Sequence, residues 1–561
     1  MKKGTKDKNG MNFSVLNRSE IIDELKGQEF DLIVIGGGIT GAGILLDAAS
    51  RGLKTALIEK MDFASGTSSK STKLIHGGLR YLKQMDFALV QEVGTERAIV
   101  HRLAPHLVLP EKMLLPLVEN GSYGKLMTSI GLKVYDVLAK VKGDDRRKML
   151  NRKEALALEP LLPKERLKGA GYYAEYRTDD ARLTIELIKT SLKYEGMAIN
   201  YMEAMDFIYD EGHISGIKAR DISTGNSIEV KSKVVVSATG PWVDELREKN
   251  KSLEGKRLHL TKGVHLVVSH KKLPVKQSIY FDIPDGRMMF AIPRGKITYF
   301  GTTDTDYKDS KENVETNAID VAYLIAAVNQ MFPSIELKDD DIISSWAGLR
   351  PLIHQDGKSA SELSRKDEIF ISPTGLISIA GGKLTGYRKM SERIVDRVIK
   401  KVANDTKPKF LECTTDKISL CGNEFRDYEE VQKYIDDIFG KIKTHGLKYQ
   451  NAWYLVTTYG KQTEIIMKQF HAFEHEDPEW RLLRAELHFC TEREMILTPM
   501  DFFIRRTGRL YFDIDSIRSY RSEVISEFFN LTNAAGAKME QWTIELDNEL
   551  DRHSNFESVE V

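Results

Sequence analysis

The sequence predicts an α/β protein with three parts: a dinucleotide-binding sheet, a mostly antiparallel β domain interleaved with it, and an all-helical C-terminal domain. A buried-strand pattern runs into a glycine-rich turn and a helix at Phe30–Gly41. Strand patterns dominate residues 258–304. After Ala403 the sequence becomes charged and helical, and strand patterns nearly disappear. A length of 561 residues also exceeds one simple core and fits roughly two or three domains.

The first glycine turn predicts a Rossmann-like dinucleotide site. Gly36, Gly38 and Gly41 have the spacing G-x-G-x-x-G. The first allows a tight turn, the second lets a pyrophosphate approach the backbone, and the third lets the helix lie close to the sheet. The helix N-terminus then offers free N–H groups and the positive end of its dipole to phosphates. Glu59 ends the next strand, where a carboxylate accepts a hydrogen bond from a ribose hydroxyl of NAD or FAD.

Composition and charge narrow the class of protein. Lys and Arg number 82, as do Asp and Glu, so the net charge is zero, which argues against a general nucleic-acid-binding surface. Cys413, Cys421 and Cys490 lack metal-ligand spacing, so we expect no metal site and a reducing cytoplasmic compartment. No signal peptide is visible, and no apolar run approaches the roughly 20 residues that span a bilayer. We therefore expect a soluble protein or one on a membrane surface.

A second strand–turn–helix pattern, Leu376–Thr385, favours FAD over NAD. NAD needs only the first turn, whereas a flavin also needs a positive environment near N1 and C2=O, where reduction places negative charge. A helix that begins near Leu384, with Lys383 beside it, would stabilise that charge. The hydroxyl- and glycine-rich loop Ala64–Lys73 suits a backbone wrapped around a polar ligand, because such long loops are uncommon without a function.

Further motifs follow in order along the chain. They are Ser71–Tyr81, Asp179–Leu183, Ala238–Trp242, Gly301–Asp304, Gly348–Leu352 and Gly381–Arg388. Together with the first glycine turn, they resemble the FAD-dependent glycerol-3-phosphate dehydrogenases of the D-amino-acid-oxidase-like flavoprotein superfamily. The resemblance runs from about Phe30 to Ala403. Leu497–Thr507, with Glu486, resembles the helical C-terminal domain of that family.

The resemblance implies a Rossmann-like FAD-binding domain, an interleaved β substrate domain and a C-terminal all-α domain. The expected regions are a tail and short helix at 1–29, the oxidoreductase region at 30–403 and the helical domain at 404–561. FAD binding is expected from about 30–80, 165–250 and 342–403, and the substrate (cap) domain from about 81–164 and 251–341. The expected FAD-binding residues are Gly36, Gly38, Gly41, Glu59, Thr67, Ser68, Ser71, Lys73, Leu74, Ala204, Gly240, Gly382, Lys383, Leu384 and Thr385.

The resemblance also implies a reaction: oxidation of sn-glycerol 3-phosphate at C2 to dihydroxyacetone phosphate, with hydride transfer to flavin N5 and electrons passed to a membrane quinone. A phosphate dianion suits arginine, whose planar fork binds its oxygens in pairs. Arg350 lies in an apolar stretch that contains glycine and proline, Arg365 follows it, and Arg80 comes from the flavin-side loop. All three match family positions near the substrate phosphate. Tyr81 and Thr385 are candidates for neutral hydrogen bonds.

The base that removes the C2 hydroxyl proton is expected to be a histidine, since its pKa lies near working pH. His76 lies on the loop expected to pass near the flavin, and His265 lies in an apolar strand, where a core histidine is the ordinary alternative. The sequence favours His76, with His265 second, and leaves open which of them acts. Lys383 is expected to support the flavin anion or the substrate.

Three other functions compete with this one. An oxidase that passes electrons to O₂ and releases peroxide would share nearly every motif. An enzyme acting on an amino acid or amine is disfavoured, because such a substrate needs an acidic or neutral pocket rather than an arginine-rich one. A non-catalytic binding scaffold is disfavoured by the intact flavin motifs.

The expected partners are glycerol 3-phosphate, a quinone and a membrane surface, with no nucleic acid. Membrane association is implied mainly by the resemblance, although the tail carries Lys2, Lys3, Lys6 and Lys8, which suit anionic lipid. We expect a cytoplasmic protein held peripherally on the inner face of the cell membrane. The role of the C-terminal domain stays open between packing, formation of a homodimer and partner binding.

Overall fold

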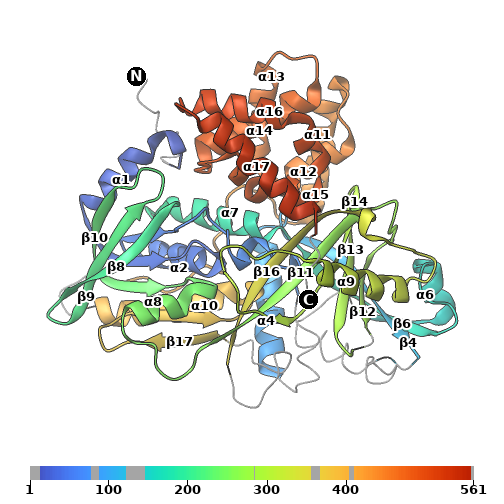
Figure 1. The fold of residues 1–561 in the computed structure, drawn as a ribbon, viewed down its shortest axis with the longest axis horizontal. Helices are drawn as coiled ribbons and strands as arrows, with labels where there is room; N and C mark the ends of the chain where they lie inside the picture. The colour runs from blue at the N-terminus through green and yellow to red at the C-terminus, as the bar shows by residue number, and fades with distance from the viewer. Residues whose placement is uncertain are drawn as a thin grey trace.

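The computed structural model has the three expected parts. It describes residues 13–76, 87–119, 121, 146–283, 285–354, 367–403 and 410–556. The first sheet and its helices lie at one end of the view, the second sheet lies at the other, and helices α11–α17 gather above the two (Figure 1). The expected fold class is confirmed.

The first sheet contains the first glycine turn. Its strands follow the order β17-β18-β10-β1-β2-β7, with β9 beside β10 and β8 beside β9. The strands from β18 to β7 are parallel to their neighbours, whereas β17, β9 and β8 pair antiparallel. The strands are β1 (Glu29–Ile35), β2 (Thr55–Ile58), β7 (Met197–Ile199), β8 (Met202–Asp210), β9 (His213–Asp221), β10 (Ser227–Ser237), β17 (Asp367–Ile371) and β18 (Ile377–Gly381).

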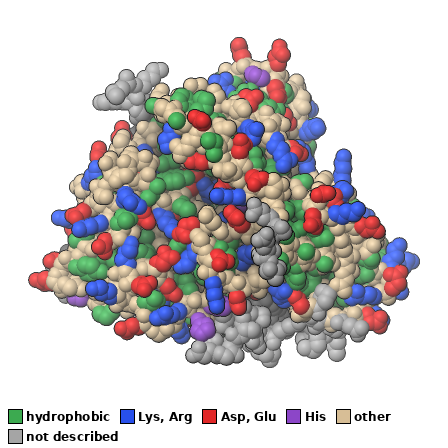
Figure 2. All heavy atoms as spheres, in the orientation of Figure 1, with side chains coloured by type: hydrophobic (Ala, Val, Ile, Leu, Met, Phe, Trp, Pro, Cys, Tyr) green, Lys and Arg blue, Asp and Glu red, His purple; other side chains and the backbone are tan. Residues whose placement is uncertain are grey.

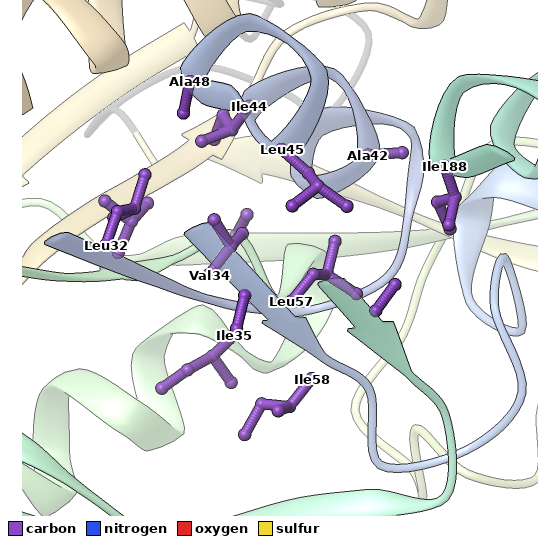
Figure 3. Close-up of a cluster of buried hydrophobic side chains, with 14 of the residues drawn as sticks. Leu32, Val34, Ile35, Ala42, Ile44, Leu45, Ala48, Leu57, Ile58 and Ile188 are labelled. Carbon is purple, nitrogen blue, oxygen red and sulfur yellow. The ribbon is translucent and has the colours of Figure 1, made fainter. Parts of the chain in front are cut away.

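Apolar packing joins this sheet to its helices. Val34 and Leu57 point from the strands toward α2 and Leu45, whereas Ile35 and Ile58 lie on the opposite face (Figure 3). All five side chains are buried. Parallel strands that are covered on both faces read as continuous apolar runs, which explains the unbroken apolar stretches Leu32–Ile35 of β1 and Ala56–Ile58 of β2. The helices around this sheet are α1 (Arg18–Lys26), α2 (Ile39–Ser50), α7 (Asp180–Leu192), α8 (Val243–Lys249) and α10 (Tyr387–Val402).

The second sheet is mostly antiparallel, as expected. Its order is β15-β11-β14-β13-β12-β4-β6-β3, with β16 beside β11 and β5 beside β6, and only the described pair β12–β4 is parallel. The strands are β3 (Leu74–Ile75), β4 (Leu109–Val118), β5 (Lys148–Asn151), β6 (Leu167–Arg177), β11 (Leu258–Ser269), β12 (Ser278–Asp282), β13 (Met288–Arg294), β14 (Ile297–Gly301), β15 (Thr305–Asp306) and β16 (Ile342–Ile353). Between these strands the sequence also forms helices α4 (Phe87–Leu103), α6 (Arg152–Leu158) and α9 (Ala318–Met331).

Three strands sit differently from the expected division of residues 30–403. Strands β3, β6 and β16 fall within segments expected to bind FAD, yet all three pair in the second sheet. For β6 and β16 the reason is their length, because each runs antiparallel to a long partner, β4 or β11, over most of its residues. The short strand β3 pairs with the end of β6. Strand β16 also contacts β18 of the first sheet.

Beyond residue 410 the described chain is helical. The helices are α11 (Tyr428–Ile442), α12 (Tyr449–Tyr459), α13 (Thr463–Ala472), α14 (Pro478–Arg493), α15 (Arg509–Phe512), α16 (Ile514–Leu531) and α17 (Lys538–Ser554), with a π-helical turn at Asp501–Arg506. Within the described ranges, no helix has the length and apolar character needed to cross a bilayer. On the face shown in Figure 2, basic and acidic side chains are interspersed, in keeping with the zero net charge.

Buried ion pairs join the helical domain to the first sheet region. The Asp62 carboxylate, in the loop after β2, accepts hydrogen bonds from Arg506 at 2.8 and 2.9 Å and from Arg505. Burial alone would raise the pKa of Asp62, but the two guanidinium groups bring it down to about 2. Arg182 of α7 donates to Glu494 at 2.6 Å. Removing one partner of such a pair leaves an uncompensated buried charge, so these contacts keep the two parts in one arrangement.

Candidate functional site

A cavity of about 380 Å³ lies at the border of the two sheets. Its wall is formed by the first glycine turn, the loop after β2, the turn after β10, parts of β11 and β16, and the second glycine turn. The carboxyl ends of β1, β10 and β18 all reach it, because these parallel strands end at one edge of the sheet. This edge is where open α/β sheets bind ligands.

The first glycine turn leaves no room for side chains. Gly36 has a φ of +111°, and a Cβ there would lie 2.6 Å from the carbonyl oxygen of Ala238. A Cβ on Gly41 would lie 1.9 Å from the carbonyl oxygen of Gly36, so α2 can approach the turn only with glycine. A Cβ on Gly38 would lie 3.0 Å from Ser68 Oγ, which accepts a hydrogen bond from the backbone of Ile39 at 2.9 Å. Small residues thus open the α2 N-terminus toward the cavity.

The Glu59 carboxylate lies beside this turn and lines the cavity. Its oxygens accept hydrogen bonds from the backbone N–H groups of Gly37, at 2.6 Å, and Met61, at 2.9 Å. Burial raises the pKa of Glu59, and the two hydrogen bonds oppose that shift. The carboxylate is therefore oriented by backbone contacts, and a carboxylate has about four acceptor positions, so capacity for a ribose hydroxyl remains.

The loop after β2 is anchored from behind. Ser71 donates its backbone N–H to Asp180 Oδ2 at 3.0 Å, and Lys73 Nζ donates to Asp180 Oδ1 at 2.6 Å. Trp346 Nε1 donates to the carbonyl oxygen of Ser71 at 3.1 Å. Lys73 is buried and turned toward α7, so the structure does not bring this expected FAD-binding residue to the cavity. It instead holds the loop that lines it.

Arg350, on β16, also lines the cavity. Its guanidinium donates to Thr302 Oγ1 at 2.8 Å and to the carbonyl oxygen of Thr303 at 3.0 Å, and pairs with Asp304 at 3.3 Å. A Cβ on Gly263 of β11 would lie 2.3 Å from Arg350 Nη2, so glycine at this position makes room for the fork. The guanidinium is half-buried at the cavity wall.

Both candidate histidines line the same cavity. The ring of His265 is 1% exposed and stacks on Trp346, with ring centroids 4.8 Å apart. Its Nε2 lies 3.0 Å from Thr72 Oγ1. Burial and the nearby cations Arg350 and Lys73 hold the pKa of His265 well below 6.5, so the ring is neutral. His76 is half-buried, with its ring edge-on to Phe290.

The second glycine turn completes the wall. Gly381 and Gly382 both have positive φ, and the chain then enters a 3₁₀ turn at Leu384–Gly386 that leads into α10. Thr385 Oγ1 donates to the carbonyl oxygen of His76 at 3.4 Å, which ties this turn to the loop after β2. Lys383 precedes the 3₁₀ turn and lines the cavity, so a cationic residue and the start of this turn border the same space.

Most of the expected site residues meet at this cavity. Those that line it are Gly36, Gly38, Glu59, Thr67, Ser68, Ser71, Leu74, His76, Ala204, Gly240, His265, Arg350, Gly382, Lys383, Leu384 and Thr385. Gly41 lies behind the turn, where it sets the distance between helix and strand. Arg80, Tyr81 and Arg365 lie outside the described residues. Thr72 also lines the wall and contacts His265; its only sequence signal was its place in a hydroxyl-rich loop.

The fold and the cavity define a dinucleotide-dependent oxidoreductase. The glycine cradle suits a pyrophosphate, Glu59 a ribose, and the second turn with Lys383 a group that gains negative charge on reduction. These residues therefore fit FAD, whose pyrophosphate and ribose would be held by Gly36–Glu59.

Comparison with known proteins agrees with this assignment to the FAD-dependent oxidoreductases. The family model "FAD dependent oxidoreductase" matches residues 31–388, and the model "C-terminal domain of alpha-glycerophosphate oxidase" matches residues 413–535. An aerobic glycerol-3-phosphate dehydrogenase of Bacillus subtilis is 49% identical over 516 residues, covering 91% of this chain and 93% of that protein. A Staphylococcus haemolyticus enzyme of the same name is 46% identical over 540 residues, or 96% and 97% of the two chains.

A solved structure also matches at full length. The glycerol-3-phosphate dehydrogenase of Bacillus halodurans, complexed with FAD, has a TM-score of 0.83 and 42% identity, and the match covers 98% of this chain and 100% of that one. The chain therefore belongs to the FAD-dependent glycerol-3-phosphate dehydrogenase family, as its motifs indicated, and its cofactor is FAD.

Proposed function

We propose that this protein oxidises sn-glycerol 3-phosphate at C2 to dihydroxyacetone phosphate and passes the electrons to a membrane quinone. The observation that carries the proposal is the grouping of Arg350, His265 and Lys383 on one cavity. The three side chains come from β16, β11 and the turn after β18, and they supply an anion-binding fork, a neutral imidazole and a second cation. The relatives' names support the same substrate.

Arg350 is proposed to bind the substrate phosphate. Its planar fork can pair with two phosphate oxygens, and the Gly263 backbone beneath it and the Thr302 hydroxyl beside it hold that fork in place. Asp304 lies 3.3 Å from Arg350 Nη1, and a bound phosphate dianion would add a second, stronger negative charge beside the guanidinium. The expected additional contacts of Arg80, Tyr81 and Arg365 remain part of the proposal.

His265 is proposed to take the C2 hydroxyl proton, in preference to His76. Its ring is neutral, so a lone pair is available at working pH, and the phosphate dianion at Arg350 would offset the cation that opposes protonation. When bound, FAD supplies the hydride acceptor. Lys383 and the backbone N–H groups of Leu384 and Thr385 are proposed to stabilise the negative charge that arrives at this end of the cavity. His76, on the same wall, is proposed to shape the pocket around C2.

The test is anaerobic mixing of the purified holoenzyme with sn-glycerol 3-phosphate while the oxidised flavin band is followed. We expect bleaching with this substrate and little with glycerol, which lacks the phosphate. If the oxidised flavin band persists after glycerol 3-phosphate is added, the proposed reaction is excluded.

A second addition identifies the acceptor. We expect the bleached enzyme to be reoxidised quickly by a water-soluble quinone and slowly by O₂. Fast reoxidation by O₂ with release of peroxide would instead establish the oxidase alternative, which the name of the matching C-terminal family model also suggests. The proposed peripheral position on the inner membrane face and the homodimer are tested by cosedimentation with anionic lipid vesicles and by light scattering.

A further inference from the structure

The His265 imidazole lines the cavity, and its hydrogen-bond contact there is with another residue, Thr72. The ring is almost completely enclosed, with Trp346 stacked on one face at 4.8 Å and Tyr299 edge-on at 6.4 Å. Its Nδ1 is sealed from solvent and has no hydrogen-bond partner among the described residues. Its Nε2 contacts the Thr72 hydroxyl at 3.0 Å. Proton exchange between this ring and a ligand therefore has its available route at Nε2, past Thr72.

Thr72 is held in position at three points. The Tyr299 hydroxyl donates to the carbonyl oxygen of Thr72 at 3.1 Å. On either side, Trp346 fixes the Ser71 carbonyl and Asp180 binds the Lys73 ammonium. The same two aromatic side chains that enclose His265 thus also anchor the loop that carries Thr72. This shared support keeps the distance from hydroxyl to ring constant.

The Thr72 side chain is half-buried and lines the cavity. Within the described parts of the chain, its hydroxyl makes one side-chain contact, the one to His265. A threonine hydroxyl can donate one hydrogen bond and accept two, so it can receive a proton from one side while it gives its own to the other. The geometry supplies the acceptor on one side, and the cavity supplies space for a donor on the other.

We propose that Thr72 is a catalytic residue that relays the proton of the substrate C2 hydroxyl to Nε2 of His265. This inference rests on the proposed oxidation of glycerol 3-phosphate. As the O–H bond at C2 breaks, its proton passes to Thr72 Oγ1, and the proton that Oγ1 carried passes to His265. The electron pair of the C2–H bond leaves as hydride to the cofactor, and the C2–O bond becomes the carbonyl. Thr72 ends with the proton count it began with.

The charges around His265 would let its imidazole hold a proton only briefly. Arg350 from β16 and Lys73 from the loop oppose a stable imidazolium, and Tyr299 from β14 is the other titratable group against the ring. A dianionic phosphate on Arg350 would weaken one of the two opposing cations. The proton is therefore held while substrate or product is bound and lost when the phosphate leaves.

The test compares Thr72→Val, which keeps the shape but lacks the hydroxyl, with Thr72→Ser, which keeps the hydroxyl but lacks the methyl group. The measured quantity is the limiting rate of anaerobic flavin bleaching by glycerol 3-phosphate. We expect Thr72→Val to slow it about 100-fold or more, and Thr72→Ser to stay within about fivefold of the unchanged protein. Thr543→Val, on an exposed part of α17, is the matched control and should have no effect.

A binding measurement separates the relay from packing. The dissociation constant of dihydroxyacetone phosphate, read from the shift of the oxidised flavin band, should change less than about threefold in Thr72→Val, because the relay acts on the proton and not on the phosphate. If Thr72→Val does not retain FAD, Thr72→Ala replaces it.

The outcomes are distinct. Bleaching at the unchanged rate in Thr72→Val overturns the relay, as does a Thr72→Ser variant as slow as Thr72→Val, which would assign the effect to the methyl group. Failure of the unchanged protein to bleach overturns the proposed function instead. Full activity of His265→Gln would show that His265 does not accept the proton, and would therefore overturn the relay as well.

Discussion

The two ends of the cofactor cavity are built in different ways. The dinucleotide end consists mainly of backbone: at Gly36 and Gly41 neighbouring backbone atoms leave no space for a Cβ, and at Gly38 a Cβ would meet Ser68 Oγ closely, at 3.0 Å. These groups lie close together in sequence, on one strand–turn–helix unit. Because this end of the cavity depends on the absence of side chains, a substitution that adds volume should impair FAD binding there more than one that changes charge.

The reactive end is built from side chains brought together by the second sheet. Arg350 and His265 come from the paired strands β16 and β11, and Thr72 comes from the loop after β2. Each makes a specific hydrogen bond or stacking contact, although Gly263 must also leave space for the Arg350 fork. Among the three side chains themselves, a change of charge or of one hydroxyl should therefore matter most.

The largest expected effect is at the reactive end. Arg350→Ala should lower kcat/KM for glycerol 3-phosphate about 10²–10³-fold, mainly through KM, because two charge-assisted hydrogen bonds to the phosphate are lost. The flavin should stay bound, as the visible spectrum will show. Arg350→Lys keeps the charge but not the fork and should recover only part of the loss. Unchanged kinetics in Arg350→Ala would remove this residue from the phosphate site.

At the dinucleotide end the expected damage is to stability. Gly41→Ala places a Cβ 1.9 Å from the Gly36 carbonyl oxygen, so α2 must shift, at a cost of about 3 kcal/mol or more. We expect a lower Tm and poor FAD retention. The control is Gly440→Ala in α11, where the new Cβ meets nothing within 4 Å and helix propensity should improve. Equal Tm values for the two variants would contradict the tight approach of helix and turn.

The same contrast explains what could be predicted from the sequence. The glycine spacing, Glu59 and the strands within residues 258–304 were predictable, because each depends on neighbours in sequence. The contact between Thr72 and His265 was not, since the two are 193 positions apart and no local pattern sets their distance. Nor could the sequence show that Lys73 turns toward Asp180 and away from the cavity. Which side of a loop a side chain takes is decided by tertiary partners.

A smaller effect is expected when a charged group is removed from the dinucleotide end. Glu59→Ala should weaken FAD binding about tenfold, because the ribose loses an acceptor and the N–H groups of Gly37 and Met61 lose theirs. Once saturated with FAD, the variant should bleach at the unchanged limiting rate. Equilibrium dialysis against FAD measures the affinity, and Glu229→Ala on the exposed edge of β10 serves as control. Full FAD retention after dialysis would count against the ribose contact.

The smallest effect concerns pH at the reactive end. Because the pKa of His265 lies well below 6.5, its ring stays neutral, and the limiting bleaching rate should change less than about twofold between pH 8 and pH 6. A histidine with the ordinary pKa would be mostly protonated at pH 6, and the rate would fall about fourfold. Arg350→Ala removes one cation that lowers this pKa, but burial, the larger cause, remains, so the rate of this variant should also fall less than about fourfold toward pH 6. A fourfold fall in the unchanged protein would show that the His265 ring is not held neutral during catalysis.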